Sequence, residues 1–149
     1  PKSNGYVKIN SKNIHEPPII NPNYLSDPYD VDVLLKSIRI GRDFLSTSSL
    51  QPYLNGQANP SNDLQTDDEL LSWARNEGIT VYHMIGTAKM GPKSDKLAVV
   101  NNKLQVRGIE SLRIADASIM PTMPSGNTNA PTMMIAEKAS DMILGKYLH

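Results

Sequence analysis

The spacing of apolar residues predicts three helices. The first covers residues 30–45, where an apolar stripe lies opposite lysine and arginine side chains. The second covers residues 66–76 and begins with a capping-box pair, Thr66 and Glu69. The third covers residues 130–144, where apolar side chains again recur at intervals of three and four.

Alternation of apolar and polar residues predicts several short strands. Residues 6–10 and 80–84 have this pattern, residues 98–100 and 104–106 resemble a strand pair, and residues 111–115 predict a last strand.

The last predicted strand leads through a polar turn into the third helix. Thr128 or Asn129 can cap this helix, and Pro131 falls in its first turn. Free N–H groups and the helix dipole make such a junction suitable for holding an anion. An ordinary strand–loop–helix connection explains the same pattern equally well.

Composition narrows the function classes. Fifteen basic residues balance fifteen acidic ones, so nothing favours a nucleic-acid or anionic-membrane partner. The chain has no cysteine, which excludes disulfides and a catalytic thiol, and no apolar stretch long enough to span a membrane. Because it begins at Pro1 and is rich in proline and loops, we expect the C-terminal part of a longer protein.

Three histidines could carry chemistry, namely His15, His83 and His149. Their spacing matches no metal-ligand pattern, so no metal site is expected. His83 differs from the others because it lies in an apolar run before a glycine–threonine turn. It is interpreted either as a histidine at a strand end or as a general base, since histidine titrates near neutral pH.

Three segments together resemble the glucose–methanol–choline (GMC) oxidoreductases. Residues 83–91 are similar to the family's H-x-x-G-T-x-x-M-G segment. Residues 104–121 resemble L-x-V-x-G followed by L-R-[VI]-x-D-[AG]-S-x-x-P, and residues 126–138 resemble G-N-T-x-A-P-T followed by I-A-E-K. Met84 and Ala88 depart from the Pro and Cys that many members carry. Residues 5–7 and 21–25 also fit the opening of the family's C-terminal region. The resemblance therefore covers nearly the whole chain, the order and spacing of the segments make it specific, and it implies an α+β fold.

The resemblance implies a flavoenzyme that oxidises a small-molecule alcohol and passes a hydride to FAD. His83 matches the family's catalytic histidine and would accept the hydroxyl proton. Asn127, rather than Asn129, matches the residue that acts together with the catalytic histidine in this family, and it would orient the substrate oxygen. The residues expected at the cofactor are Asp116, Ala117, Thr128, Asn129, Pro131 and Thr132.

The family resemblance also implies a domain organisation. Residues 1–110 would belong mostly to a substrate-binding domain with an antiparallel sheet, and residues 111–149 would supply the last strand and helix of the FAD-binding domain. The family's G-x-G-x-x-G segment is absent from this sequence, so the expected partner is a missing N-terminal FAD-binding part. Two alternatives are a flavin-containing lyase on the same fold and a non-catalytic interaction module.

Overall fold

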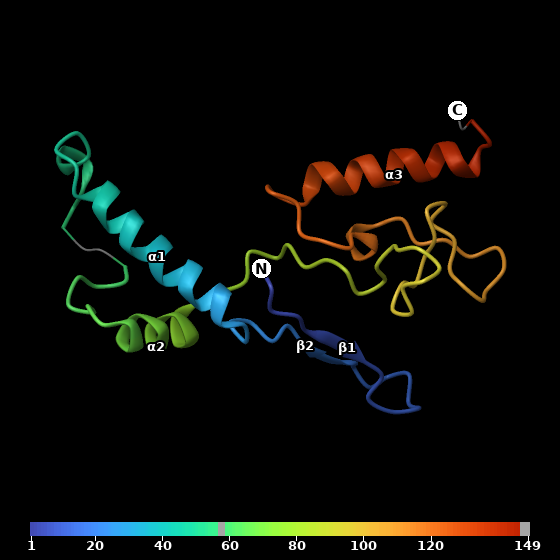
Figure 1. The fold of residues 1–149 in the computed structure, drawn as a ribbon, viewed down its shortest axis with the longest axis horizontal. Coiled ribbons are helices and arrows are strands. Elements are labelled where there is room, and N and C mark those ends of the chain that lie inside the picture. Colours follow the sequence, from blue (N-terminus) through green and yellow to red (C-terminus); the bar gives the residue numbers. More distant parts are fainter. Residues whose placement is uncertain (57–58, 147–149) are drawn as a thin grey trace. The chain divides into compact units, whose positions relative to one another are not determined.

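The chain divides into two compact units. The computed structural model describes residues 1–56 and 59–146, and His149, considered above, lies outside them. The first unit is Pro1–Ile79 and the second begins at Thr80 (Figure 1). The predicted division at residue 110 was based on the family resemblance and stays a prediction.

A small antiparallel sheet opens the first unit. Strand β1, Tyr6–Lys8, pairs with β2, Ile19–Asn21, so that Tyr6 lies opposite Asn21. In this register Ile9 and Asn10 would lie opposite Pro18 and Pro17, and proline has no N–H to donate, which ends the ladder at Lys8. The expected strand at residues 6–10 is therefore present but shorter.

Two helices complete the first unit, and local signals explain their starts. Helix α1, Pro28–Leu45, begins where the Asp27 carboxylate accepts the Tyr29 N–H at 2.8 Å. Helix α2, Asp67–Glu77, begins with the predicted capping box of Thr66 and Glu69. A short 3-10 helix, η1, Gln51–Tyr53, lies between them.

Buried leucines and a bridging arginine hold α1 and α2 together. Leu35 of α1 and Leu70 of α2 are buried, and the helices contact each other. Arg42 of α1 donates to the carbonyl oxygens of Leu64 and Ser61 at 2.8 and 2.7 Å, just before α2. Arg39 and Asp67 add an ion pair on the exposed surface.

Among its described residues, 80–146, the second unit has one long helix, α3, Asn129–Ile143, and one 3-10 helix, η2, Ala117–Ile119. The strand predictions here were wrong. Residues 80–84 form no strand, and the other predicted strands reduce to single bridges, Val100 with Val106 and Gln105 with Arg113.

Backbone conformation explains why these strands do not form. Tyr82, Leu104 and Ser111 each have φ near +60°, in the left-handed region that an extended strand does not allow. Each of the three residues falls within a predicted strand. The apolar residues of 98–106 belong to loops that turn back on a shared core. Val81, Tyr82 and Met84 are exposed instead.

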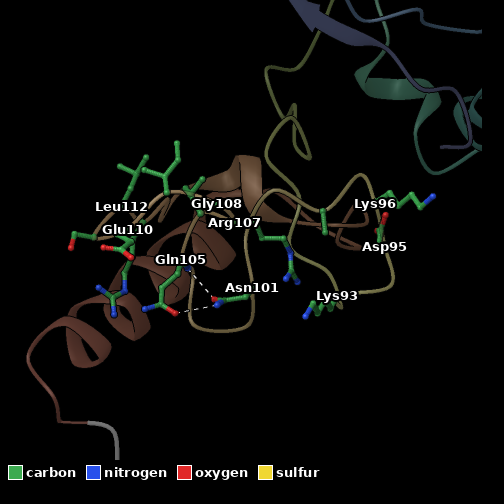
Figure 2. Close-up of a pocket in the computed structure, with 14 residues that line it drawn as sticks. Lys93, Asp95, Lys96, Asn101, Gln105, Arg107, Gly108, Glu110 and Leu112 are labelled. Carbon is green, nitrogen blue, oxygen red and sulfur yellow. Dashed lines mark hydrogen bonds between the residues drawn. The ribbon is translucent and has the colours of Figure 1, made fainter.

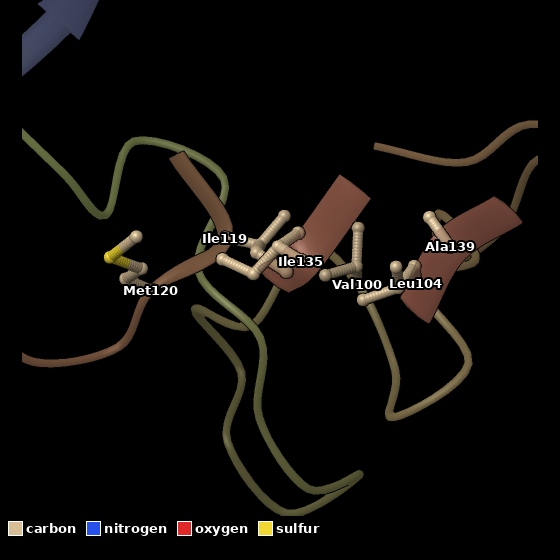
Figure 3. Close-up of a cluster of buried hydrophobic side chains, with 6 residues drawn as sticks. All are labelled: Val100, Leu104, Ile119, Met120, Ile135 and Ala139. Carbon is tan, nitrogen blue, oxygen red and sulfur yellow. The ribbon is translucent and has the colours of Figure 1, made fainter. Parts of the chain in front are cut away.

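That core is an apolar cluster beneath α3, shown in Figure 3. It consists of Val100, Leu104, Ile119, Met120, Ile135 and Ala139. Ile135 and Ala139 lie four residues apart and therefore face the same side of α3. The cluster joins α3 to η2 and to the loop of residues 98–106. With a two-stranded antiparallel sheet and three α-helices, the predicted α+β class is confirmed.

Truncating the buried core should destabilise the protein, and the chain offers a matched control. Val100 is 0% exposed, whereas Val81 is 72% exposed. Val100→Ala removes apolar contacts and leaves a cavity, so we expect a loss of about 2–3 kcal/mol in the free energy of unfolding. Val81→Ala should change it by less than about 0.5 kcal/mol. Urea unfolding measures both, and equal losses would contradict the assigned core.

Acid should weaken the attachment of the N-terminal segment to α1. Hydrogen bonds from the Ser3 side chain and from the amides of Ser3 and Lys2 lower the pKa of Asp30 from 3.8 to about 2. Because the folded pKa is depressed, this stabilisation is present above about pH 4 and is lost as the pH falls through about 2. Hydrogen exchange of the Lys2 and Ser3 amides should rise over that window relative to the intrinsic rate. In Asp30→Asn the rise should be absent, and an unchanged rise would contradict the assignment.

Candidate functional site

The centre of the candidate site is a hydrogen bond between two residues far apart in the sequence. Nδ1 of His83 lies 3.0 Å from Oγ1 of Thr128, across 45 positions of the chain. His83 is half-buried and lies in a segment without regular secondary structure, whereas Thr128 is buried at the start of α3. Two segments expected at the site from sequence therefore meet within the second unit.

Thr128 can reach His83 because it does not cap its own helix. A capping threonine has an extended backbone and accepts an N–H of the first turn. Thr128 is the N-cap of α3, but its φ of −76° and ψ of −8° are helical and its side chain makes no capping hydrogen bond. The hydroxyl is left for the histidine. Sequence reasoning expected Thr128 as a cap or cofactor contact and missed this bond, since nothing local indicates it.

Some backbone N–H groups in the first turn of α3 have no hydrogen-bond acceptor within the helix. Thr132 directs both its N–H and its hydroxyl at the Thr128 carbonyl, at 3.0 and 2.7 Å. Pro131 has no N–H, so the amides of Asn129 and Ala130 are the orphan donors of this turn. The first turn carries no acidic residue. This end of the helix can therefore accept a negatively charged or strongly polar group.

Backbone hydrogen bonds hold the segment after His83 against η2. The N–H of Ala88 donates to Ser118 at 3.0 Å, and that of Met90 donates to Ile119 at 2.7 Å. Gly86, with φ of +85°, passes so close to Met120 that an added Cβ would lie 3.3 Å from its carbonyl oxygen. The segment is thus fixed at several points between His83 and the core.

The remaining predicted site residues lie around the same turn, with local roles of their own. Asp116 is exposed and caps η2, where its carboxylate accepts the Ser118 N–H at 2.8 Å. Ala117 is the first residue of η2 and packs against the apolar cluster. Asn127 is exposed and directly precedes Thr128, and Asn129 is exposed at the first position of α3.

A separate open hollow of about 740 Å³ is lined by side chains between Lys93 and Arg113, and none of the predicted site residues lines it (Figure 2). Its basic residues are partly engaged in holding the loops. Arg107 donates to the Gly91 carbonyl at 2.6 Å and Arg113 to the Lys103 carbonyl at 3.3 Å. Neither His83 nor Thr128 lines it. We therefore do not assign the hollow to the candidate site.

The described part of the chain contains neither a candidate metal site nor a candidate membrane-spanning helix. Residues 1–56 and 59–146 contain no cluster of three or more His, Cys, Asp or Glu side chains that could hold a metal ion. Among the same residues, no helix combines the length and apolar character that crossing a bilayer requires.

Known proteins match this chain over nearly its whole length. The model of the family described as GMC oxidoreductase matches residues 1–136. The chain is 42% identical to the alcohol dehydrogenase (acceptor) of Pseudomonas putida, over 98% of this chain and 26% of that protein. It is 44% identical to the oxygen-dependent choline dehydrogenase of Staphylococcus aureus, over 97% of this chain and 26% of that protein.

A solved structure shares the fold. The FAD-dependent oxidoreductase of Chaetomium thermophilum superposes with a TM-score of 0.83 at 30% identity, over 95% of this chain and 24% of that one. The chain thus spans about a quarter of the length of the proteins it matches. The matched family model covers well over half of the chain, and the chain therefore belongs to the GMC oxidoreductase family.

Proposed function

We propose that this chain is the C-terminal part of an FAD-dependent enzyme that oxidises the CH–OH group of a small alcohol. The family match and the names of the two dehydrogenase relatives support this reaction class. The structural observation that supports it best is the hydrogen bond of His83 to Thr128. It holds a histidine beside the helix start where Asn127 and two orphan amides also lie.

The start of α3 fits part of the cofactor. The amides of Asn129 and Ala130 can donate to polar oxygen atoms, and no acidic residue of the first turn opposes negative charge there. FAD, when bound, supplies the acceptor for the hydride. Asp116, Ala117, Thr128, Asn129, Pro131 and Thr132 remain the residues proposed to contact it. The sequence contains no G-x-G-x-x-G segment, so binding of the ADP half of FAD requires another part of the enzyme.

In this proposal His83 accepts the substrate hydroxyl proton on Nε2, the ring nitrogen opposite the one bonded to Thr128. Loss of that proton leaves negative charge on the substrate oxygen and so favours departure of the hydride from the adjacent carbon. The Asn127 side chain cannot act as a base, but its NH₂ group can donate a hydrogen bond to the same oxygen. Asn127 would thereby stabilise the charge that develops there.

Removal of the base tests the proposal directly. His83→Ala in the full-length enzyme should slow anaerobic flavin reduction by the alcohol by roughly 100- to 10,000-fold, the usual effect of losing a general base. Stopped-flow absorbance measures the rate. His15→Ala is the matched control, because His15 is exposed and lies in the first unit, and its rate should stay within about twofold of wild type. A His83→Ala enzyme that reduces flavin at the wild-type rate would exclude the role, and a substrate turned over without flavin reduction would favour the lyase.

The two asparagines that flank Thr128 provide a second test. Asn127→Ala should lower the limiting rate of flavin reduction by roughly 100-fold or more, as expected when an oxyanion donor is lost. Asn129→Ala should slow it less, since only the backbone of Asn129 is proposed to act. The same stopped-flow assay compares them. If Asn129→Ala is the more damaging change, the substrate-orienting residue is Asn129 instead.

A further inference from the structure

The buried side chain of Thr128 is hydrogen-bonded to the imidazole of His83. Of the polar side chains that the structure describes, Thr128 alone is buried, at 8% exposure. Its one side-chain hydrogen bond to another residue is the 3.0 Å contact with Nδ1 of His83. A buried hydroxyl needs a partner, so its position and that of the imidazole are linked. We propose that Thr128 is a positioning residue for His83, an inference that rests on the function proposed above.

The direction of the hydrogen bond decides what it does. A neutral imidazole carries one N–H and one lone pair, and the hydroxyl can either donate or accept. If Nδ1–H donates to Oγ1 of Thr128, the lone pair lies on Nε2. If the hydroxyl donated instead, Nε2 would hold the proton and could not accept another. Base function at Nε2 therefore requires Thr128 to be the acceptor.

This direction is compatible with both protonation states of the ring. When Nε2 takes the proton from the substrate hydroxyl, both ring nitrogens carry hydrogen. Nδ1–H still donates to Oγ1, so the contact neither breaks nor reverses during the transfer. Thr128 gains and loses no proton in this step. It holds the ring orientation and the tautomer, which is the role of a second residue behind a general base.

Both partners of the bond are attached to the core. Ile135 and Ala139 anchor α3 in the apolar cluster, and Thr128 is the N-cap of that helix. On the other side, the segment after His83 is bound to η2 through Ala88 and Met90. A rigid support of this kind keeps the hydroxyl where the imidazole needs it. Thr128 has helical φ and ψ and makes no capping hydrogen bond, so its hydroxyl is free of the α3 backbone and contacts His83.

Side-chain exchange in the full-length enzyme tests the inference. Thr128→Val keeps the shape and removes the hydroxyl, so the limiting rate of anaerobic flavin reduction should fall about tenfold while the apparent substrate Kd changes less than twofold. Thr128→Ala is a second variant without the hydroxyl, and Thr128→Ser should restore most of the rate. A rate for Thr128→Val and Thr128→Ala within twofold of wild type would overturn the inference.

A double-mutant cycle with His83→Ala separates positioning from other effects. If Thr128 acts through His83, Thr128→Val should change the rate less than twofold once the histidine is gone. Thr132→Val is the control, because its hydroxyl donates to the Thr128 carbonyl and not to His83. Thr132→Val should change the rate of flavin reduction by the same factor in the wild-type enzyme and in the His83→Ala enzyme. A tenfold effect of Thr128→Val in both backgrounds would show that Thr128 acts independently of the histidine.

Crystal structures of the variants give a readout besides the rate. The His83 ring should turn or become disordered in Thr128→Val and should keep its contact near 3.0 Å in Thr128→Ser. An unmoved ring in Thr128→Val would contradict positioning. The outcomes also separate the two proposals. Flavin reduction at the wild-type rate in His83→Ala overturns the proposed function. If His83→Ala reduces flavin slowly but Thr128→Val does so at the wild-type rate, only the role of Thr128 is overturned.

Discussion

The apolar cluster under α3 is the constraint on which the second unit depends. Outside α3 and η2, the described residues of this unit are joined by single β-bridges and turns, so no continuous sheet ladder fixes them. Val100, Leu104 and Ile119 instead bury their side chains against Ile135 and Ala139. Burial of apolar surface is non-directional, which lets irregular loops converge on one helix face. The backbone hydrogen bonds from Ala88 and Met90 to η2 then set the register of the loop after His83.

The candidate site is a consequence of that packing. Once the cluster fixes α3, its N-terminal turn is fixed as well, and the helical conformation of Thr128 makes its hydroxyl available to His83. The same turn has orphan amides at Asn129 and Ala130 because the first residues of a helix have no helical carbonyl four positions before them. A single helix start thus combines a histidine partner with backbone donors. In the function proposed above, this combination would serve proton transfer next to a polar cofactor.

Features that depend on residues close together in the sequence were predicted correctly, and features that depend on distant partners were not. Thr66 and Glu69 form the predicted capping box of α2, since a cap needs only residues two or three positions away. The predicted strand at residues 111–115 depended on partners elsewhere in the chain and reduced to one bridge, while Ser111 adopts φ of +59°. An alternating pattern does not show whether a neighbouring strand exists to complete the ladder, nor whether its apolar residues are buried, since Ile9 and Val81 are exposed.

Residues 111–132, which were predicted to form a strand, a turn and the start of a helix, show both outcomes. The sequence alone determined the helix, its start near Thr128 and, through the family's motifs, the candidates His83 and Asn127. These depend on local propensity and on residue identity, which the sequence contains in full. Only the tertiary structure decided that Thr128 faces His83 instead of capping α3. Capping and the histidine contact compete for one hydroxyl, and the outcome depends on a residue 45 positions away that the packed core brings within 3.0 Å.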